Sequence, residues 1–226
     1  MTCREVSDDL RKAAEILWKG NVLLDSDEKP EKPFPFVNTP TPLQEYIDLI
    51  KNRDYTFLLK DGSVIQMGFK FDAGGFIEKH RLTFFHSPLA HMIKNLGGLL
   101  NKDDVVVALE LLLGDSPSDE DTSPEQCPGK GFPLVYSFRL DYDENGQHLV
   151  NHPKSHATFL SENCRIAVNS YFDVRTFLLL VFGNLWAEYG KEVLGELQSL
   201  VKRAYAQSAT FLPNDYNLLY GVHFSL

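Results

Sequence analysis

The sequence predicts an α+β domain: an antiparallel sheet of five or more strands with helices packed on one face. Short segments that alternate apolar and polar residues recur through the middle of the chain, as half-buried strands do. Asp61-Gly62 lies between two of them, and this dipeptide is a strong signal for a tight hairpin. Segments with helical spacing of apolar residues occupy both ends of the chain.

Length and composition predict one domain over residues 1–226. The chain is 43% hydrophobic and 23% charged, which is ordinary for a globular protein. Residues 30–42 are expected to form a Pro-rich arm, and residues 114–130 an acidic, flexible loop. The net charge of -9 argues against a surface that coats nucleic acid non-specifically, because such binding needs many cations.

The cysteine content and the apolar runs predict a cytoplasmic location. Three widely spaced cysteines give no disulfide framework, and the charged N-terminus does not read as a signal peptide. The most apolar run, residues 177–186, is far shorter than the roughly 20 residues of a membrane span. We therefore expect no membrane partner.

The periodicities predict individual elements in order along the chain. Helices are expected over 5–24 (capped by Ser7-Asp8), 43–53 (begun by Thr41-Pro42), 89–96, 103–113, 172–188 (begun by Asp173) and 192–206. A buried strand is the alternative for 103–113. Strands are expected over 55–60, 64–72, 76–85, 133–143, 155–160 and 164–168, and an extended aromatic tail over 210–226.

Alternation along these strands predicts one strongly polar sheet face. Side chains alternate between the faces of a strand, so the apolar positions share one face and the polar positions the other. If the strands form one sheet, the polar face carries Lys70, Asp72, Lys79, Arg81, Arg139, Asp141, His156, Thr158 and Arg165. That face is locally cationic in an acidic protein.

These residue types suit chemistry on a phosphate. Arginine offers a fixed fork of donors to phosphate oxygens, and histidine transfers protons near neutral pH. His156 is the candidate general acid or base, and Asp141 would orient it or bind a metal. A plain solvated face remains an alternative, since many antiparallel sheets expose one polar face.

Spacing alone does not indicate a metal site among the histidines. His148, His152 and His156 recur every four residues, but Pro153 argues against a helix that would align them. A site that combines His152 and His156 with Asp141 or Asp143 stays open, so a divalent metal is a candidate cofactor. His80 and His86 share a face with apolar residues and are interpreted as core or boundary histidines. The common nucleotide-binding and hydrolase motifs are absent.

Residues 136–186 resemble an uncharacterised bacterial family. The resemblance rests on an Arg-x-Asp-Tyr-Asp element, a His-Pro-x-Ser-His element, an Arg-Ile-x-Val element and a following apolar helix. The matching positions are Arg139, Asp141, Tyr142, Asp143, His152, Pro153, Ser155, His156, Arg165, Ile166 and Val168. The chain departs from the family at Ala157-Thr158-Phe159. The pattern is also similar to TumE-type toxins of toxin–antitoxin pairs, which implies a toxin or phage-defence context.

Two hypotheses follow. In the first, the protein is a toxin or defence effector that acts on a phosphodiester or nucleotide, with RNA or a nucleotide as ligand. Its catalytic residues would be His156, Asp141 and the auxiliary His152, and its substrate-binding residues Arg139, Arg165, Arg81 and Lys70. In the second, it is a non-catalytic interaction module whose partner is an antitoxin or defence component. The residues alone leave open whether the protein is an enzyme.

Overall fold

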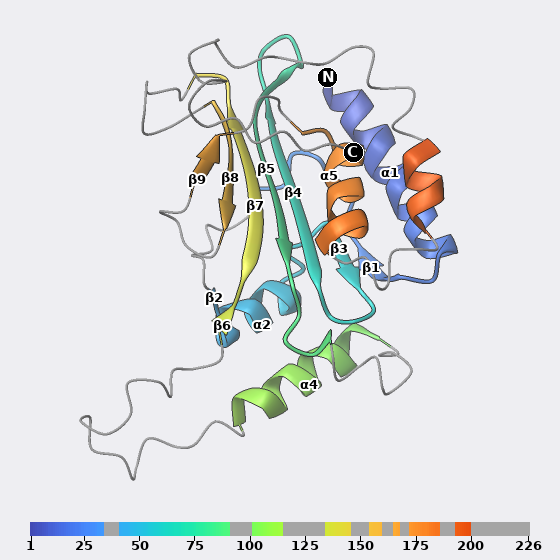
Figure 1. Ribbon diagram of the computed structural model, residues 1–226, viewed down its shortest axis with the longest axis vertical. Coiled ribbons are helices and arrows are strands. Elements are labelled where there is room, and N and C mark those ends of the chain that lie inside the picture. Colours follow the sequence, from blue (N-terminus) through green and yellow to red (C-terminus); the bar gives the residue numbers. More distant parts are fainter. Residues whose placement is uncertain are drawn as a thin grey trace, which may run out of the picture.

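A computed structural model gives the fold of the 226-residue chain. The structure describes residues 1–33, 41–90, 101–114, 134–145, 154–159, 165–167, 172–185 and 193–199. Within these ranges the architecture is α+β, as predicted, with an antiparallel sheet at its centre (Figure 1). No helix in the described part of the chain is long and apolar enough to cross a membrane.

The main sheet has seven described strands in the order β1-β3-β4-β5-β7-β8-β9, with every neighbouring pair antiparallel. Five of them form its long middle and outer part: β4 (Val64–Phe71), β5 (Ile77–Phe85), β7 (Ser137–Asp143), β8 (Ser155–Phe159) and β9 (Arg165–Ala167). Two short strands, β1 (Leu23–Ser26) and β3 (Phe57–Leu59), complete the other edge. A separate pair joins β2 (Thr41–Pro42) to β6 (Leu134–Val135).

Local turn chemistry sets the central meander. Gly62 has a φ of 81° in the β3–β4 turn, which glycine adopts without steric cost, and Asp61 accepts a 2.8 Å hydrogen bond from the Ser63 amide. The β4–β5 turn contains Gly75 at φ 78°, and Asp72 accepts a 2.9 Å bond from the Phe76 amide. The predicted Asp61-Gly62 turn is confirmed.

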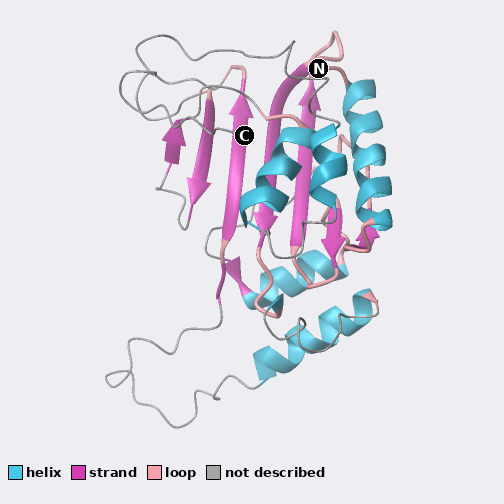
Figure 2. Cartoon of the chain, turned by 45° about the vertical axis from the view of Figure 1, so that its right-hand side comes forward, coloured by secondary structure: helices cyan, strands magenta, loops and turns pink. Residues whose placement is uncertain are grey.

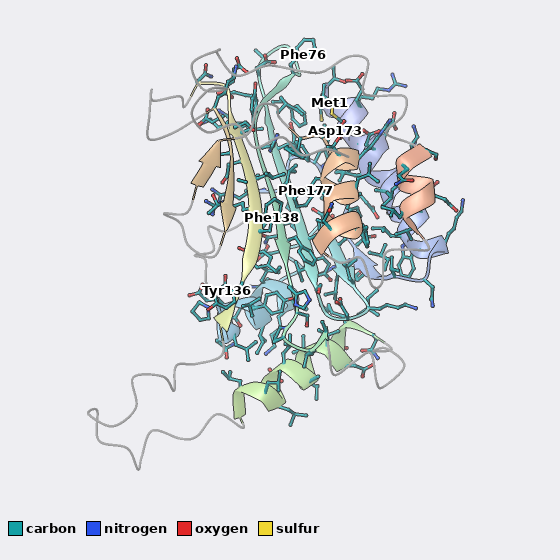
Figure 3. All side chains as sticks on the ribbon, viewed as in Figure 1. Met1, Phe76, Tyr136, Phe138, Asp173 and Phe177 are labelled. Atoms are coloured by element: carbon teal, nitrogen blue, oxygen red, sulfur yellow. The ribbon has the colours of Figure 1, made fainter. Side chains whose placement is uncertain are left out.

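Helices cover the apolar face of the sheet. Helix α1 (Cys3–Lys19) and helix α5 (Val174–Leu180) lie on this face (Figure 2), and α5 continues as a π-helical segment, Val181–Leu185. Their buried residues join those of the strands in one core, where Phe138 of β7 stacks on Phe177 of α5 at 6.3 Å between ring centroids (Figure 3). The helical segment 193–199 adds Val193 and Leu197 to this core.

Two further helices pack at one end of the opposite face. A second core forms here between the sheet and the helices α2 (Leu43–Lys51) and α4 (Lys102–Gly114). The strands contribute Leu58, Val64 and Phe85, which point away from the core under α1 and α5. Figure 1 shows both helices at the lower end of the sheet. The polar residues of this face therefore lie beyond the helix-covered end.

The first helix starts and ends earlier than predicted. It begins at Cys3, because Thr2 and Glu5 form a capping box ahead of Ser7-Asp8. It ends at Lys19, and residues from Leu23 enter a strand, so the predicted helix over 5–24 is wrong at both ends. Asn21 has a positive φ of 58°, which breaks the helical path.

Other boundaries were predicted with mixed success. Thr41-Pro42 forms a short strand and gives α2 no side-chain cap, so its predicted capping role is wrong. The strand predicted over 133–143 is split at Tyr136, whose side chain is half exposed. Helix α4 is confirmed, as is Asp173, which caps α5 by accepting a 2.7 Å bond from Thr176. The segments predicted over 89–96, 114–130 and 210–226 lie wholly or mostly outside the described residues.

Candidate functional site

Strand pairing arranges the predicted polar residues in rows across the sheet. The register sets Gly68, Arg81, Asp141 and His156 opposite one another on β4, β5, β7 and β8. Two residues along the strands, a second row contains Gln66, Thr83, Arg139, Thr158 and, by backbone register, Arg165. In the other direction a third row contains Lys70, Lys79 and Asp143. The rows bring together residues that are up to 99 positions apart in sequence, from Gln66 to Arg165.

Asp141 is the centre of this arrangement. Its Oδ1 accepts a 3.1 Å hydrogen bond from Nε of Arg81, and its Oδ2 accepts a 2.6 Å bond from Nε of Arg139. Nε2 of His156 lies 3.6 Å from the same Oδ2, within ion-pair distance. One carboxylate thus holds two guanidinium groups and an imidazole from three adjacent strands.

The cluster is largely removed from water. The exposed fraction is 4% for Arg139 and 3% for His156, whereas the Arg81 side chain is one-third exposed. Burial alone would raise the pKa of the Asp141 carboxyl, but Arg139, Arg81 and His156 outweigh it and leave that pKa below its ordinary value. Asp141 is therefore ionised at neutral pH and anchors its neighbours as an anion.

A pocket of about 620 Å³ lies over this cluster. Its walls include the Glu31–Pro33 segment, which follows β1 and runs beside β4, where the Phe69 amide donates a 3.1 Å bond to the Pro30 carbonyl. The lining contains five cationic side chains (Lys32, Lys70, Lys79, Arg81, Arg139) against three carboxylates (Glu31, Asp141, Asp143). The lining therefore has more cationic than anionic side chains, although Lys32 and Lys70 pair with Asp27 and Glu78 just outside it.

Two threonines flank Arg139 on the neighbouring strands. Thr83 and Thr158 stand opposite it in the register and are 3% and 1% exposed. Neither hydroxyl has a hydrogen-bond partner among the described residues. Buried hydroxyls normally have a partner, but neither threonine lines the pocket, so these two hydroxyls are buried beside Arg139 without contacting the pocket.

The structure brings together four of the predicted site residues and places a fifth at the rim. Asp141, His156, Arg81 and Arg139 meet in the cluster, and Lys70 lines the pocket and pairs with Glu78 at 2.7 Å. His152 and the side chain of Arg165 lie outside the described residues. No group of three His, Cys, Asp or Glu residues within the described ranges is arranged to hold a metal ion.

Sequence reasoning missed two features of the pocket. The wall formed by Glu31–Pro33 was expected only as a surface arm, because nothing in its composition indicates which strand it follows. Gly68 lies opposite Arg81 and gives this position of the polar face no side chain. A glycine inside a strand signals that a ligand or another backbone approaches closely, and that signal was available in the sequence.

His80 lies on the opposite, helix-covered face and is not part of the cluster. It is buried, stacks on Tyr142 at 5.4 Å between ring centroids and meets the edge of Phe69 at 6.0 Å. Burial lowers the pKa of His80 from 6.5 to about 4. The prediction of a core histidine is confirmed for His80, whereas His86 is exposed.

His80 predicts a loss of stability in mild acid. Between pH 6.5 and about 4 the unfolded chain binds a proton at this residue that the folded chain does not, so the free energy of unfolding falls as pH falls. The gap between these values corresponds to about 3 kcal/mol. We expect urea unfolding of His80→Leu to show a weaker fall over this range than the wild type, and the exposed-site variant His86→Gln to match the wild type. Equal acid dependence in all three proteins would contradict a neutral, buried His80.

Comparisons with known proteins identify a family for the chain. No curated protein and no solved structure matches it. The model of one family, described as "Uncharacterized conserved protein (DUF2290)", matches residues 19–218. That range covers most of the chain and includes every residue of the cluster, and we conclude that the chain belongs to the DUF2290 family.

Proposed function

We propose that this protein is an enzyme that binds RNA at the Asp141 cluster and cleaves a phosphodiester there. One observation carries the proposal: Asp141 holds two arginines and a histidine together at the floor of a pocket whose lining is net cationic. Perturbed, convergent charged groups in a cleft are the usual mark of a functional site.

The arginines would bind the phosphate. A bond from Nε to Asp141 fixes the plane of each guanidinium, and a guanidinium so fixed presents its donors in the fork geometry that phosphate oxygens need. The charge that develops on the phosphorane oxygens during cleavage would then face preorganised cations.

His156 would be the general base. It would take the proton of a ribose 2′-hydroxyl as that oxygen forms its bond to phosphorus and the bond from phosphorus to the 5′ oxygen breaks. The departing 5′ oxygen would take a proton from water, and the hydroxide so formed would take the proton held by His156, which restores the base. The products would be a cyclic phosphate and a free 5′-hydroxyl. Asp141, 3.6 Å away, would orient the imidazole and stabilise its protonated form.

The cellular role is proposed as that of a cytoplasmic toxin or defence effector. The Arg/Asp/His-rich strand pattern of this chain resembles that of TumE-type toxins, and this resemblance supports the proposed role. An auxiliary part for His152, phosphate contact by Arg165 and a requirement for a divalent metal belong to the same proposal. A cleavage assay run with added magnesium and with chelator measures the metal requirement.

The deciding experiment compares wild type with Arg139→Gln on single-stranded RNA and on free nucleotides. Loss of one preorganised donor typically costs about 10²–10³ in rate, and we expect a fall of this size. Arg11→Gln is the matched control, because Arg11 is also paired with an aspartate, at 3.1 Å, but lies on α1 away from the pocket. Cleavage by the Arg139 variant at the wild-type rate, with the fold intact by circular dichroism, would contradict the assignment.

A second candidate is a non-catalytic interaction module of a toxin–antitoxin or defence assembly. One observation favours it: Val107 and Leu111, one turn apart on α4, are 54% and 65% exposed. Exposed apolar residues in such a pair suit a protein partner. This candidate predicts that the wild type neither cleaves RNA nor binds nucleotides, which the same assay measures.

A further inference from the structure

Two lysines face each other at the rim of the pocket. Lys70 of β4 and Lys79 of β5 are direct partners in the strand register, and both line the pocket. Like charges at directly opposite positions destabilise a sheet. Two opposed cations beside a pocket whose lining is mostly cationic suit a role in binding an anion.

A β-bulge supplies the counter-charge for one of the two lysines. The register passes from Lys70 opposite Lys79 to Phe71 opposite Ile77, which leaves Glu78 as the extra residue. Its carboxylate lies 2.7 Å from Lys70, and Asp143 lies 2.7 Å from Lys79. Bulges redirect side chains in this way and are frequent beside active sites.

These ion pairs are weak enough to exchange for a ligand. The side chains of Lys70 and Lys79 are 63% and 45% exposed, and ion pairs at exposed positions contribute little to stability. A phosphate that approached the rim could therefore bind either ammonium group without breaking a buried contact.

The spacing of the rows indicates what kind of anion fits. The third row, which contains Lys70 and Lys79, lies two residues along the strands from the row of Arg81 and Asp141. This separation corresponds to roughly 6.7 Å. Successive phosphates of a nucleic-acid strand are separated by a comparable distance. The phosphates of a nucleoside diphosphate share a bridging oxygen and lie much closer together, so they would not reach both rows.

We infer that the site takes single-stranded RNA with one phosphate at Arg81 and Arg139 and the neighbouring phosphate at Lys70 and Lys79. The inference rests on the proposed function and adds to it the single-stranded form of the RNA and a second phosphate subsite. A duplex does not suit the site, because its phosphates lie on the outside of a wide, rigid cylinder and Arg139 is only 4% exposed at the pocket floor.

The test compares a strand with a single phosphate. The two probes are uridine monophosphate and a 2′-O-methyl oligouridylate of about eight nucleotides. The oligonucleotide lacks the reactive hydroxyl, and its length is typical for single-strand sites. Binding is measured by fluorescence anisotropy and by calorimetry across a range of salt concentrations. In the double variant Lys70→Gln/Lys79→Gln, we expect affinity for the oligonucleotide to fall about tenfold or more and the salt slope to become shallower by about 1.4. Affinity for the monophosphate should stay unchanged.

Two single variants sharpen the result. Glu78→Gln removes the competing carboxylate while keeping both lysines, so it should tighten oligonucleotide binding several-fold. Lys51→Gln is the matched control, because Lys51 is also 45% exposed and paired with a glutamate, Glu110, but lies on α2. It should bind both probes as the wild type does.

The outcomes separate this inference from the proposed function. If the double variant binds both probes as tightly as the wild type does, or if its affinity for both falls by the same factor, the strand subsite is wrong. The phosphate site at the arginines then still stands. If the wild type binds neither probe, the proposed function fails and the subsite fails with it. Thermal melts of each variant exclude unfolding as the cause of a loss.

Discussion

Asp141→Asn is expected to lower the free energy of unfolding by about 3–5 kcal/mol, the usual cost of removing one partner from a buried ion pair. The substitution keeps the shape of the side chain but removes the charge that holds Arg81 and Arg139. Arg139 is almost fully buried, so water cannot replace the lost carboxylate around its guanidinium. Urea denaturation at neutral pH measures the effect.

Asp143→Asn is the matched control for this measurement. Asp143 is two residues away on the same strand and the same face, and its partner Lys79 is half exposed. Pairs of this kind contribute about 0–1 kcal/mol, so the control should remain close to the wild type. If Asp141→Asn lowered the free energy of unfolding as little as the control does, the two arginines would be solvated. The cluster would then not be a desolvated site.

The wild-type pH dependence gives an independent check on Asp141. Because its folded-state pKa is below the ordinary value of 3.8, its stabilising contribution is complete above that pH and is lost as pH falls through the folded value. His80 acts in a separate window, from 6.5 down to about 4. Asp141→Asn should therefore remove the fall in stability at the lowest pH. The fall due to His80 should remain and become larger, because the Asp141 charge raises the pKa of His80 and its loss leaves burial unopposed by that charge.

Much of the cluster could be predicted from alternation alone. Arg81, Arg139, Asp141 and His156 each occupy polar positions in strands whose other positions are apolar, and that pattern assigns them to one face. Which of them meet depends on the register between strands. Register is set by turns and bulges, and most of these connections span many residues in this chain.

The unpredicted features depend on contacts between segments far apart in sequence. The bulge at Glu78 appears only when β4 and β5 are aligned, and the Glu31–Pro33 wall appears only when the chain after β1 is placed beside β4. Likewise, the sequence places Val64 and Phe85 only at the ends of alternating strands. In the structure they belong to a second core that packs against α2 and α4. Short-range patterns contain no information about these pairings.

His156→Gln is expected to reduce RNA cleavage by about 10²–10⁴-fold, the usual contribution of a positioned general base. Glutamine is close to histidine in size and polar, so it should leave the cluster folded, but it cannot accept a proton near neutral pH. RNA binding, which the arginines and lysines would supply, should stay close to that of the wild type.

The pH profile distinguishes a general base from a structural role for His156. The wild-type rate should rise with pH as the imidazole loses its proton, and this limb should be missing in His156→Gln. His86→Gln, at an exposed histidine that does not line the pocket, should keep both the rate and the profile. A His156 variant that melts at the wild-type temperature and cleaves at the wild-type rate would remove the imidazole from the mechanism. The site would then be left with two arginines on one carboxylate. That arrangement can bind a phosphate, and the lowered pKa of the Asp141 carboxyl makes it a poor acceptor for the proton of the attacking hydroxyl.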